Sequence, residues 1–121
     1  MAFTSDVDLL LEASDLVVSK AGGLTCAEAL VKHTPLVVFR PTPGHEVANA
    51  QYLESSGAAV HADSLETVAA TVSRWLADPA ALQRARESAA RLAHPDAAKS
   101  VAERVLESVR RGGNHAREGA A

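Results

Sequence analysis

The chain has 121 residues and a formal net charge of −3, so we expect a single domain without a general attraction for DNA, RNA or anionic lipid. Aromatic residues make up only 3% of the sequence, which argues against a platform that stacks single-stranded bases. Cys26 is its one cysteine, which excludes a disulfide framework and a thiolate metal cluster and fits a reducing cytoplasm.

The first predicted elements lead into a pair of glycines. A short helix is expected over residues 6–13, with Leu9 and Leu10 facing the core. The apolar, β-branched run 16–18 predicts a parallel strand that is buried on both faces. Gly22-Gly23 then form a turn whose backbone has no Cβ to obstruct a ligand.

Helices and strands continue to alternate after this glycine turn. A helix is predicted over residues 24–32, followed by a buried strand over 36–39. The segment 40–44 holds two prolines and a glycine, which predicts a rigid loop. A helix over 45–55 and a shorter strand over 58–60 complete this part of the chain.

The remaining sequence predicts helices only. Apolar residues at helical spacing indicate helices over 64–77, 79–92 and 97–110, the last of them burying Val101 and Val105. Asp63 or Ser64 is expected to cap the first of these helices, and Asp78 followed by Pro79 the second.

The element order predicts an α/β fold. We expect a partial Rossmann-like parallel sheet of about three to four strands with flanking helices and a helical C-terminal part. The expected division is βα units over 1–62, helices over 63–111 and, after Gly112-Gly113, a disordered tail over 112–121. So few strands leave an open sheet edge, which indicates either part of a larger assembly or self-association.

Two strand-to-helix loops, 19–25 and 40–46, are predicted to open on the same sheet edge, where ligands bind in parallel sheets. The first loop offers the backbone N–H groups of Gly23, Leu24 and Thr25, and the positive end of a helix dipole, to a phosphate. It matches neither the GxGxxG pattern nor the Walker P-loop, so simple turn geometry stays open as an alternative.

Polar side chains lie close to both loops. Glu28, one turn into its helix, could accept hydrogen bonds from a sugar diol, and the second loop presents His45, Glu46 and Asn49 to hydroxyl-rich ligands. Taken singly, each would be an ordinary surface residue. Lys20 could neutralise a phosphate or project into solvent.

Two other kinds of chemistry find little support in the sequence. Cys26 stands at a helix beginning, where thiol pKa values can fall, but no His–carboxylate pair accompanies it. The histidines lack ligand spacing such as HxxxH, so no metal site is expected.

A combination of motifs over residues 3–62 resembles the C-terminal half of GT-B glycosyltransferases of family 28. The motifs are Ser19-Lys-Ala-Gly-Gly-Leu-Thr-Cys-Ala-Glu-Ala-Leu30, Thr34-Pro35-Leu36, Pro41-Thr-Pro-Gly-His-Glu-Val-Ala-Asn-Ala50 and Gly57-Ala-Ala59. That family includes monogalactosyldiacylglycerol synthase-like enzymes, diacylglycerol glucosyltransferases and the peptidoglycan N-acetylglucosaminyltransferase.

The resemblance implies a donor site for a UDP-sugar, with no cofactor and no essential metal. It implies that the diphosphate is held by Ser19, Ala21, Gly22, Gly23, Leu24 and Thr25. It assigns the ribose hydroxyls to Glu28. It places the transferred sugar near Pro43, Gly44, His45, Glu46 and Asn49, the last of which would fix the loop.

The implied reaction is inverting transfer of a hexose to a lipid-linked acceptor hydroxyl. The acceptor site and general base are expected in an N-terminal domain outside these 121 residues, so the catalytic residues stay unknown and the isolated chain is expected to be inactive. The alternatives are a non-catalytic subunit that completes a split enzyme and another GT-B-shaped UDP-sugar enzyme such as an epimerase. No apolar run approaches the roughly 20 residues that span a bilayer and the start lacks a signal-peptide pattern, so we expect a soluble, cytoplasmic protein or a peripheral one at the inner membrane face.

Overall fold

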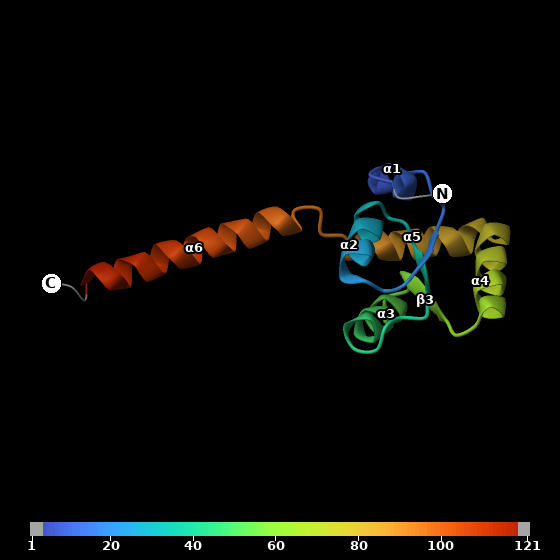
Figure 1. Cartoon of the computed structure of the whole chain (residues 1–121). Helices are drawn as coiled ribbons and strands as arrows, with labels where there is room; N and C mark the ends of the chain where they lie inside the picture. Colours follow the sequence, from blue (N-terminus) through green and yellow to red (C-terminus); the bar gives the residue numbers. More distant parts are fainter. Residues whose placement is uncertain (1–3, 119–121) are drawn as a thin grey trace.

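The chain alternates helices and strands before it ends in three consecutive helices (Figure 1). The computed structural model describes the backbone of residues 4–118 and the side chains of residues 4–111. In chain order the elements are α1 (Val7–Glu12), β1 (Val17–Ser19), α2 (Gly23–Val31), β2 (Leu36–Phe39), α3 (His45–Ser55), β3 (Ala59–Ala62), α4 (Leu65–Ala77), α5 (Pro79–Leu92) and α6 (Ala97–Glu118).

A parallel sheet organises the domain. The described residues form three strands in the order β1-β2-β3, and their register aligns Val17 with Leu36 and Leu36 with Ala59. This arrangement confirms the predicted α/β fold with a partial Rossmann-like sheet. Because the strands are parallel, the loops that follow β1 and β2 lie at the same edge.

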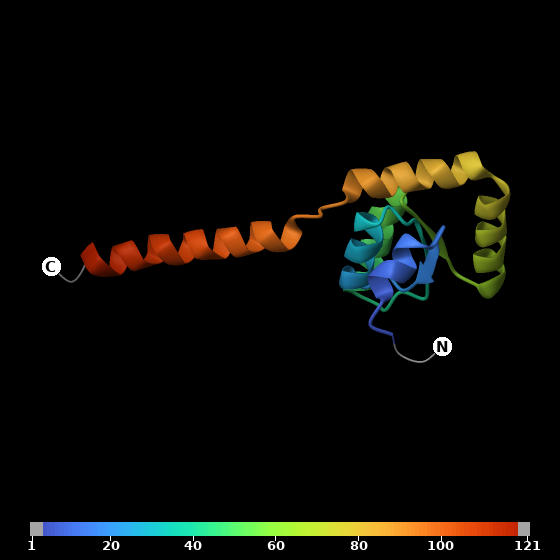
Figure 2. The same ribbon diagram turned by 90° about the horizontal axis from the view of Figure 1, so that it is seen from above.

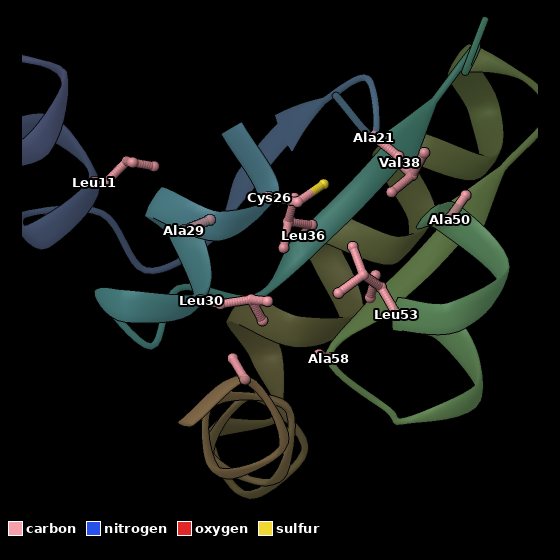
Figure 3. Packing of buried hydrophobic residues seen from close by; sticks show 12 residues of the cluster. Leu11, Ala21, Cys26, Ala29, Leu30, Leu36, Val38, Ala50, Leu53 and Ala58 are labelled. Carbon is pink, nitrogen blue, oxygen red and sulfur yellow. The ribbon is translucent and has the colours of Figure 1, made fainter. Parts of the chain in front are cut away.

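The central strand β2 supplies both faces of the core. Leu36 and Val38 lie in one cluster with Leu30 of α2 and Leu53 of α3, which Figure 3 shows from close by. On the other face, Val37 belongs to a cluster that includes Trp75 of α4. All three side chains of β2 in these clusters have no exposed surface, so the sheet is fixed most firmly at its centre.

The edge strand β1 is only partly covered. The prediction that the run 16–18 is buried on both faces is wrong, because 45% of Val18 is exposed. Its register partner Val37 is fully buried in the cluster that contains Trp75, so the helices on this face cover the central strand but not Val18. β1 therefore presents an apolar side chain at the sheet edge.

Helix α1 buries one side chain against the body of the domain. Leu11 is buried, whereas Leu9 and Leu10 are 60% and 42% exposed, so the prediction that these two leucines face the core is wrong. The helix comprises only residues 7–12, less than two turns, and can present just one narrow face to the domain.

The helix boundaries predicted from capping residues are confirmed for α4 and α5. Ser64 accepts a hydrogen bond from the backbone N–H of Thr67 at 3.1 Å. Asp78 accepts one from the N–H of Ala81 at 3.0 Å, and Pro79 occupies the first turn of α5. These polar side chains stop and start the helices because they satisfy N–H groups that have no partner inside the helix.

Helix α6 extends away from the rest of the domain (Figures 1 and 2). The predicted burial of Val101 and Val105 is wrong, since 62% and 57% of these side chains are exposed. The helix also runs past Gly112-Gly113, where the sequence predicted its end, to Glu118. Each helical glycine disfavours the helix by only about 1 kcal/mol relative to alanine, which is not an obligatory stop. Residues 119–121 of the predicted tail lie outside the described residues.

No helix among residues 4–118 combines the length and the apolar character needed to cross a membrane.

Candidate functional site

Two short loops at the carboxyl edge of the sheet bring the sequence motifs together. β1 ends at Ser19 and α2 begins at Gly23, while β2 ends at Phe39 and α3 begins at His45. The parallel pairing of β1 with β2 places the segments 20–22 and 40–44 beside each other. This register explains why the two loops lie at the same sheet edge, as the sequence predicted.

The glycine turn opens the first helix without any side-chain cap. Gly22 is the N-cap residue, in an extended conformation, and its carbonyl accepts the first helical hydrogen bond from the N–H of Cys26 at 2.9 Å. The N–H groups of Gly23, Leu24 and Thr25 precede that bond, so they have no acceptor within the helix. Leu24 is 76% exposed, which shows that this turn is open to solvent.

Neither glycine of the turn is required by the fold. Gly22 has φ −63° and Gly23 is helical, conformations that any residue adopts. A Cβ built on Gly22 would lie 3.8 Å from Glu46 Oε1, and one on Gly23 would lie 4.0 Å from Asn49 Nδ2, both ordinary contacts. A methyl group would therefore fit at either position without displacing a neighbouring atom.

The helix after the second loop reaches across to the glycine turn. Asn49, half-buried on α3, donates a 2.9 Å hydrogen bond from Nδ2 to the carbonyl oxygen of Ala21. Ala21 has no exposed surface, so its side chain cannot touch a ligand. Among the residues that the resemblance assigns to the diphosphate, Ala21 could therefore contribute only its backbone.

Glu46 folds back on its own loop. Its Oε2 accepts a hydrogen bond from the backbone N–H of Thr42 at 2.5 Å, and its Oε1 is the nearest atom to the space above Gly22. The backbone and side-chain hydrogen bonds from Thr42, with a smaller contribution from Lys20, hold the pKa of Glu46 below its ordinary value against the opposing effect of desolvation. The carboxylate is therefore charged at neutral pH.

The loop held by Glu46 has an unusual backbone. Arg40 has φ 49° and Gly44 has φ 103°, so left-handed residues stand at both of its ends. A non-glycine residue in this region is uncommon and persists where its surroundings fix it. Sequence reasoning missed Thr42, although a signal was present: it lies between Pro41 and Pro43 and is the only one of these three residues with an N–H to donate.

Other predicted site residues lie on exposed surfaces nearby. Pro43, Gly44 and His45 are exposed where α3 begins, and Ser19 is half-buried at the end of β1. Glu28 is exposed on the side of α2 that faces α1, where it lines a cleft of about 370 Å³. The structure thus brings Glu46 and Asn49 to the glycine turn and sets Glu28 on a different side of α2.

The environment of the thiol disfavours its reactive form, and the described histidines join no metal-binding group. Cys26 lies on the buried face of α2, and its pKa is raised by burial and, to a smaller degree, by the nearby Glu46 charge. Such a thiol stays neutral and is a poor nucleophile. Among residues 4–111, no group of three or more His, Cys, Asp and Glu side chains could hold a metal ion.

Comparison with known proteins identifies the family of the chain. Residues 1–101 match the model of the glycosyltransferase family 28 C-terminal domain. A probable chloroplastic monogalactosyldiacylglycerol synthase 3 of Oryza sativa subsp. japonica is 34% identical over 112 residues, which are 92% of this chain and 22% of that protein. A processive diacylglycerol beta-glucosyltransferase of Bacillus subtilis (strain 168) is 28% identical over 106 residues, covering 88% of this chain and 28% of the relative.

The same description applies to a relative from Bacillus thuringiensis (strain Al Hakam), a processive diacylglycerol beta-glucosyltransferase that is 30% identical over 87% of this chain and 27% of its own length. The chain thus spans about a quarter of the length of the curated relatives it matches. The match includes both loops of the candidate site and nearly all of the described domain. The chain therefore belongs to the glycosyltransferase family 28 C-terminal domain family.

Proposed function

We propose that this chain is the donor-binding part of a glycosyltransferase and that it holds a UDP-sugar at the glycine turn. The observation that carries the proposal is the pair Gly22-Gly23 at the start of α2, where neither the backbone conformation nor the packing of the domain requires glycine. A backbone without side chains, followed by the first N–H groups of a helix, suits the close approach of a diphosphate.

Different residues would bind the diphosphate, the ribose and the transferred sugar. The N–H groups from Gly22 to Thr25, with Ser19 and the backbone of Ala21 beside them, would hold the diphosphate. From its separate position on α2, in the cleft that faces α1, Glu28 would bind the ribose hydroxyls. The transferred sugar would lie against the exposed start of α3, near Pro43, Gly44, His45, Glu46 and Asn49.

The proposed reaction is inverting transfer of a hexose to the hydroxyl of a lipid acceptor. The relatives carry the names of a galactolipid synthase and of diacylglycerol glucosyltransferases, which supports this substrate class. The positive end of α2 would stabilise the charge that develops on the departing UDP, which requires no metal. The general base and the acceptor site would come from residues outside this chain, so the chain alone should bind donor without transferring it.

A second candidate is a non-catalytic subunit that works with a partner chain carrying the acceptor domain. Two surfaces favour it: the exposed Val18 at the sheet edge and the row of exposed apolar residues on α6, which comprises Val101, Val105, Leu106 and Val109. In either case we place the protein in the cytoplasm, where UDP-sugars are used, or at the inner face of the membrane.

Titration of UDP into the ¹⁵N-labelled chain tests the donor proposal. The amide signals of Gly22, Gly23 and Thr25 should shift, and a spectrum that stays unchanged at millimolar UDP would overturn the proposal. Glu28→Ala should weaken the binding of UDP more than that of inorganic pyrophosphate, since pyrophosphate has no ribose. Equal losses would reject the ribose assignment.

Alanine substitutions at the glycines separate binding from folding. Gly22→Ala and Gly23→Ala should abolish the UDP-dependent shifts while the melting temperature holds or rises, because alanine fits both conformations and restricts the unfolded chain. Gly57→Ala is the matched control: its φ of 81° and a Cβ contact of 3.2 Å with Ser88 Oγ predict lower stability. A large loss of stability in Gly22→Ala would show that the fold requires this glycine, and its presence would then no longer support donor binding.

A further inference from the structure

Two side chains in the first turns of α3 each hold one loop of the candidate site. Asn49 binds the carbonyl oxygen of Ala21 in the glycine turn, and Glu46 binds the N–H of Thr42 in the second loop. The two partners lie on different βα units, twenty-one positions apart in the sequence, yet both bonds end on one helix. We call Glu46 and Asn49 together the α3 clasp.

The clasp is the hydrogen-bonded link between the loops in the described structure. Among residues 4–111, no backbone hydrogen bond joins the segment 19–23 to the segment 40–46, and the Asn49 bond is the side-chain bond that connects α3 with the glycine turn. The strands themselves pair only up to Ser19 and Val38. Beyond that point the two bonds of the clasp connect each loop to α3.

The clasp atoms also face the space where a ligand would lie. Glu46 Oε1 and Asn49 Nδ2 are the nearest heavy atoms to the positions that Cβ atoms would take on Gly22 and Gly23. Glu46 Oε2 and Asn49 Nδ2 already have partners in Thr42 and Ala21. These two groups are therefore engaged in holding backbone before any ligand arrives.

From this geometry we infer that Asn49 is a positioning residue for the diphosphate: through the Ala21 carbonyl it fixes the glycine turn against α3, while Glu46 fixes the facing loop through Thr42. The inference rests on the donor-binding proposal and deepens it, because it assigns Asn49 to the shape of the diphosphate site as well as to the sugar pocket. A preformed turn binds an anion better because the backbone N–H groups need no reordering.

The choice of ligand separates positioning from direct sugar contact. If Asn49 positions the turn, Asn49→Ala should raise the dissociation constants of pyrophosphate and UDP by the same factor, about 3- to 10-fold for one lost hydrogen bond, and that of UDP-glucose by at least as much. If Asn49 only touches the sugar, pyrophosphate and UDP should bind as they do to the parent chain, and UDP-glucose alone should weaken. That second pattern would overturn the inference.

The ligand-free protein supplies an independent readout. In ¹⁵N spectra without ligand, Asn49→Ala should shift the amides of Gly22 and Gly23, and their ¹⁵N relaxation should show greater mobility. Gln51→Ala is the matched control, since it removes an exposed amide from the same helix and should change neither spectrum nor affinity. Melting temperatures of both variants show whether the domain as a whole stays folded.

These measurements distinguish failure of the clasp from failure of donor binding. If the parent chain binds neither pyrophosphate nor UDP, the proposed function fails. The amide shifts and relaxation of the ligand-free Asn49→Ala variant still test whether Asn49 fixes the glycine turn. If the parent chain binds UDP and Asn49→Ala leaves the glycine amides and all three affinities unchanged, the clasp is wrong while the proposed function stands.

Discussion

The hydroxyl of Thr34 donates a 2.9 Å hydrogen bond to the carbonyl oxygen of Leu11 and thereby joins the turn before β2 to the end of α1. Thr34 is 2% exposed, so the bond is shielded from water. Thr34→Val would keep the shape of the side chain and leave the Leu11 carbonyl without this donor. The Leu11 carbonyl keeps the N–H of Ser14 as a donor at 3.2 Å, so we expect a loss of about 0.5–1.5 kcal/mol in the free energy of unfolding, measured by urea denaturation. Ser14→Ala, which removes an exposed hydroxyl bonded to Leu10 in the same region, should lose much less.

The lowered pKa of Glu46 predicts a dependence of stability on pH. A carboxylate whose pKa is lower in the folded state stabilises that state above its unfolded pKa, near the ordinary 4.5, and this contribution disappears as the pH falls through the lowered folded pKa. Glu46→Gln should therefore flatten the fall in stability below about pH 4.5. Unfolding midpoints measured in urea between neutral and acidic pH check this, and parallel curves for the two proteins would contradict it.

Cys26 should react slowly with thiol reagents in the folded protein. Its pKa is raised by burial, and the Glu46 charge adds to this effect, so little thiolate forms at neutral pH. The rate of reaction with Ellman's reagent should rise sharply in denaturing urea. In Glu46→Gln, the Cys26 pKa should fall, which the pH dependence of the Cys26 ¹³Cβ chemical shift can measure.

Helix α6 should contribute little to the stability of the domain. Every residue from 97 to 111 is exposed, and α6 supplies no member of either core cluster. A variant that ends at Asp96 should unfold within about 0.5 kcal/mol of the full chain, as judged by circular dichroism in urea. A clearly lower midpoint would show that α6 packs on the domain in solution.

The sequence allowed much of the fold to be predicted because its signals were local. The β2 run is apolar and continuous, and Ser64, Asp78 and Pro79 mark helix starts through hydrogen bonds with residues close in sequence. The exposure of Val18 and Val105 could not be predicted in this way. An apolar residue at the right spacing indicates a face, but whether another element covers that face depends on the tertiary arrangement.

The candidate site was predictable in its position and less so in its contacts. The two loops follow consecutive parallel strands, so the topology alone places them at one edge. That Asn49 reaches the Ala21 carbonyl, twenty-eight residues away, depends on the crossing of α2 and α3. The hydrogen bond between Glu46 and Thr42 depends on the positive φ angles of Arg40 and Gly44. The sequence gives no indication that an arginine will adopt such an angle.

The order of the strands has a consequence for how the domain folds. β1, β2 and β3 stand in the sheet in the order in which they occur in the chain, and each is joined to the next by a single helix. Every closure is therefore short in sequence, which lowers its entropic penalty and favours rapid folding for a parallel sheet. None of the three strands in the described part of the chain has to enter between two that are already paired. The sheet can thus grow outward from β2, one neighbouring unit at a time, in either direction along the chain.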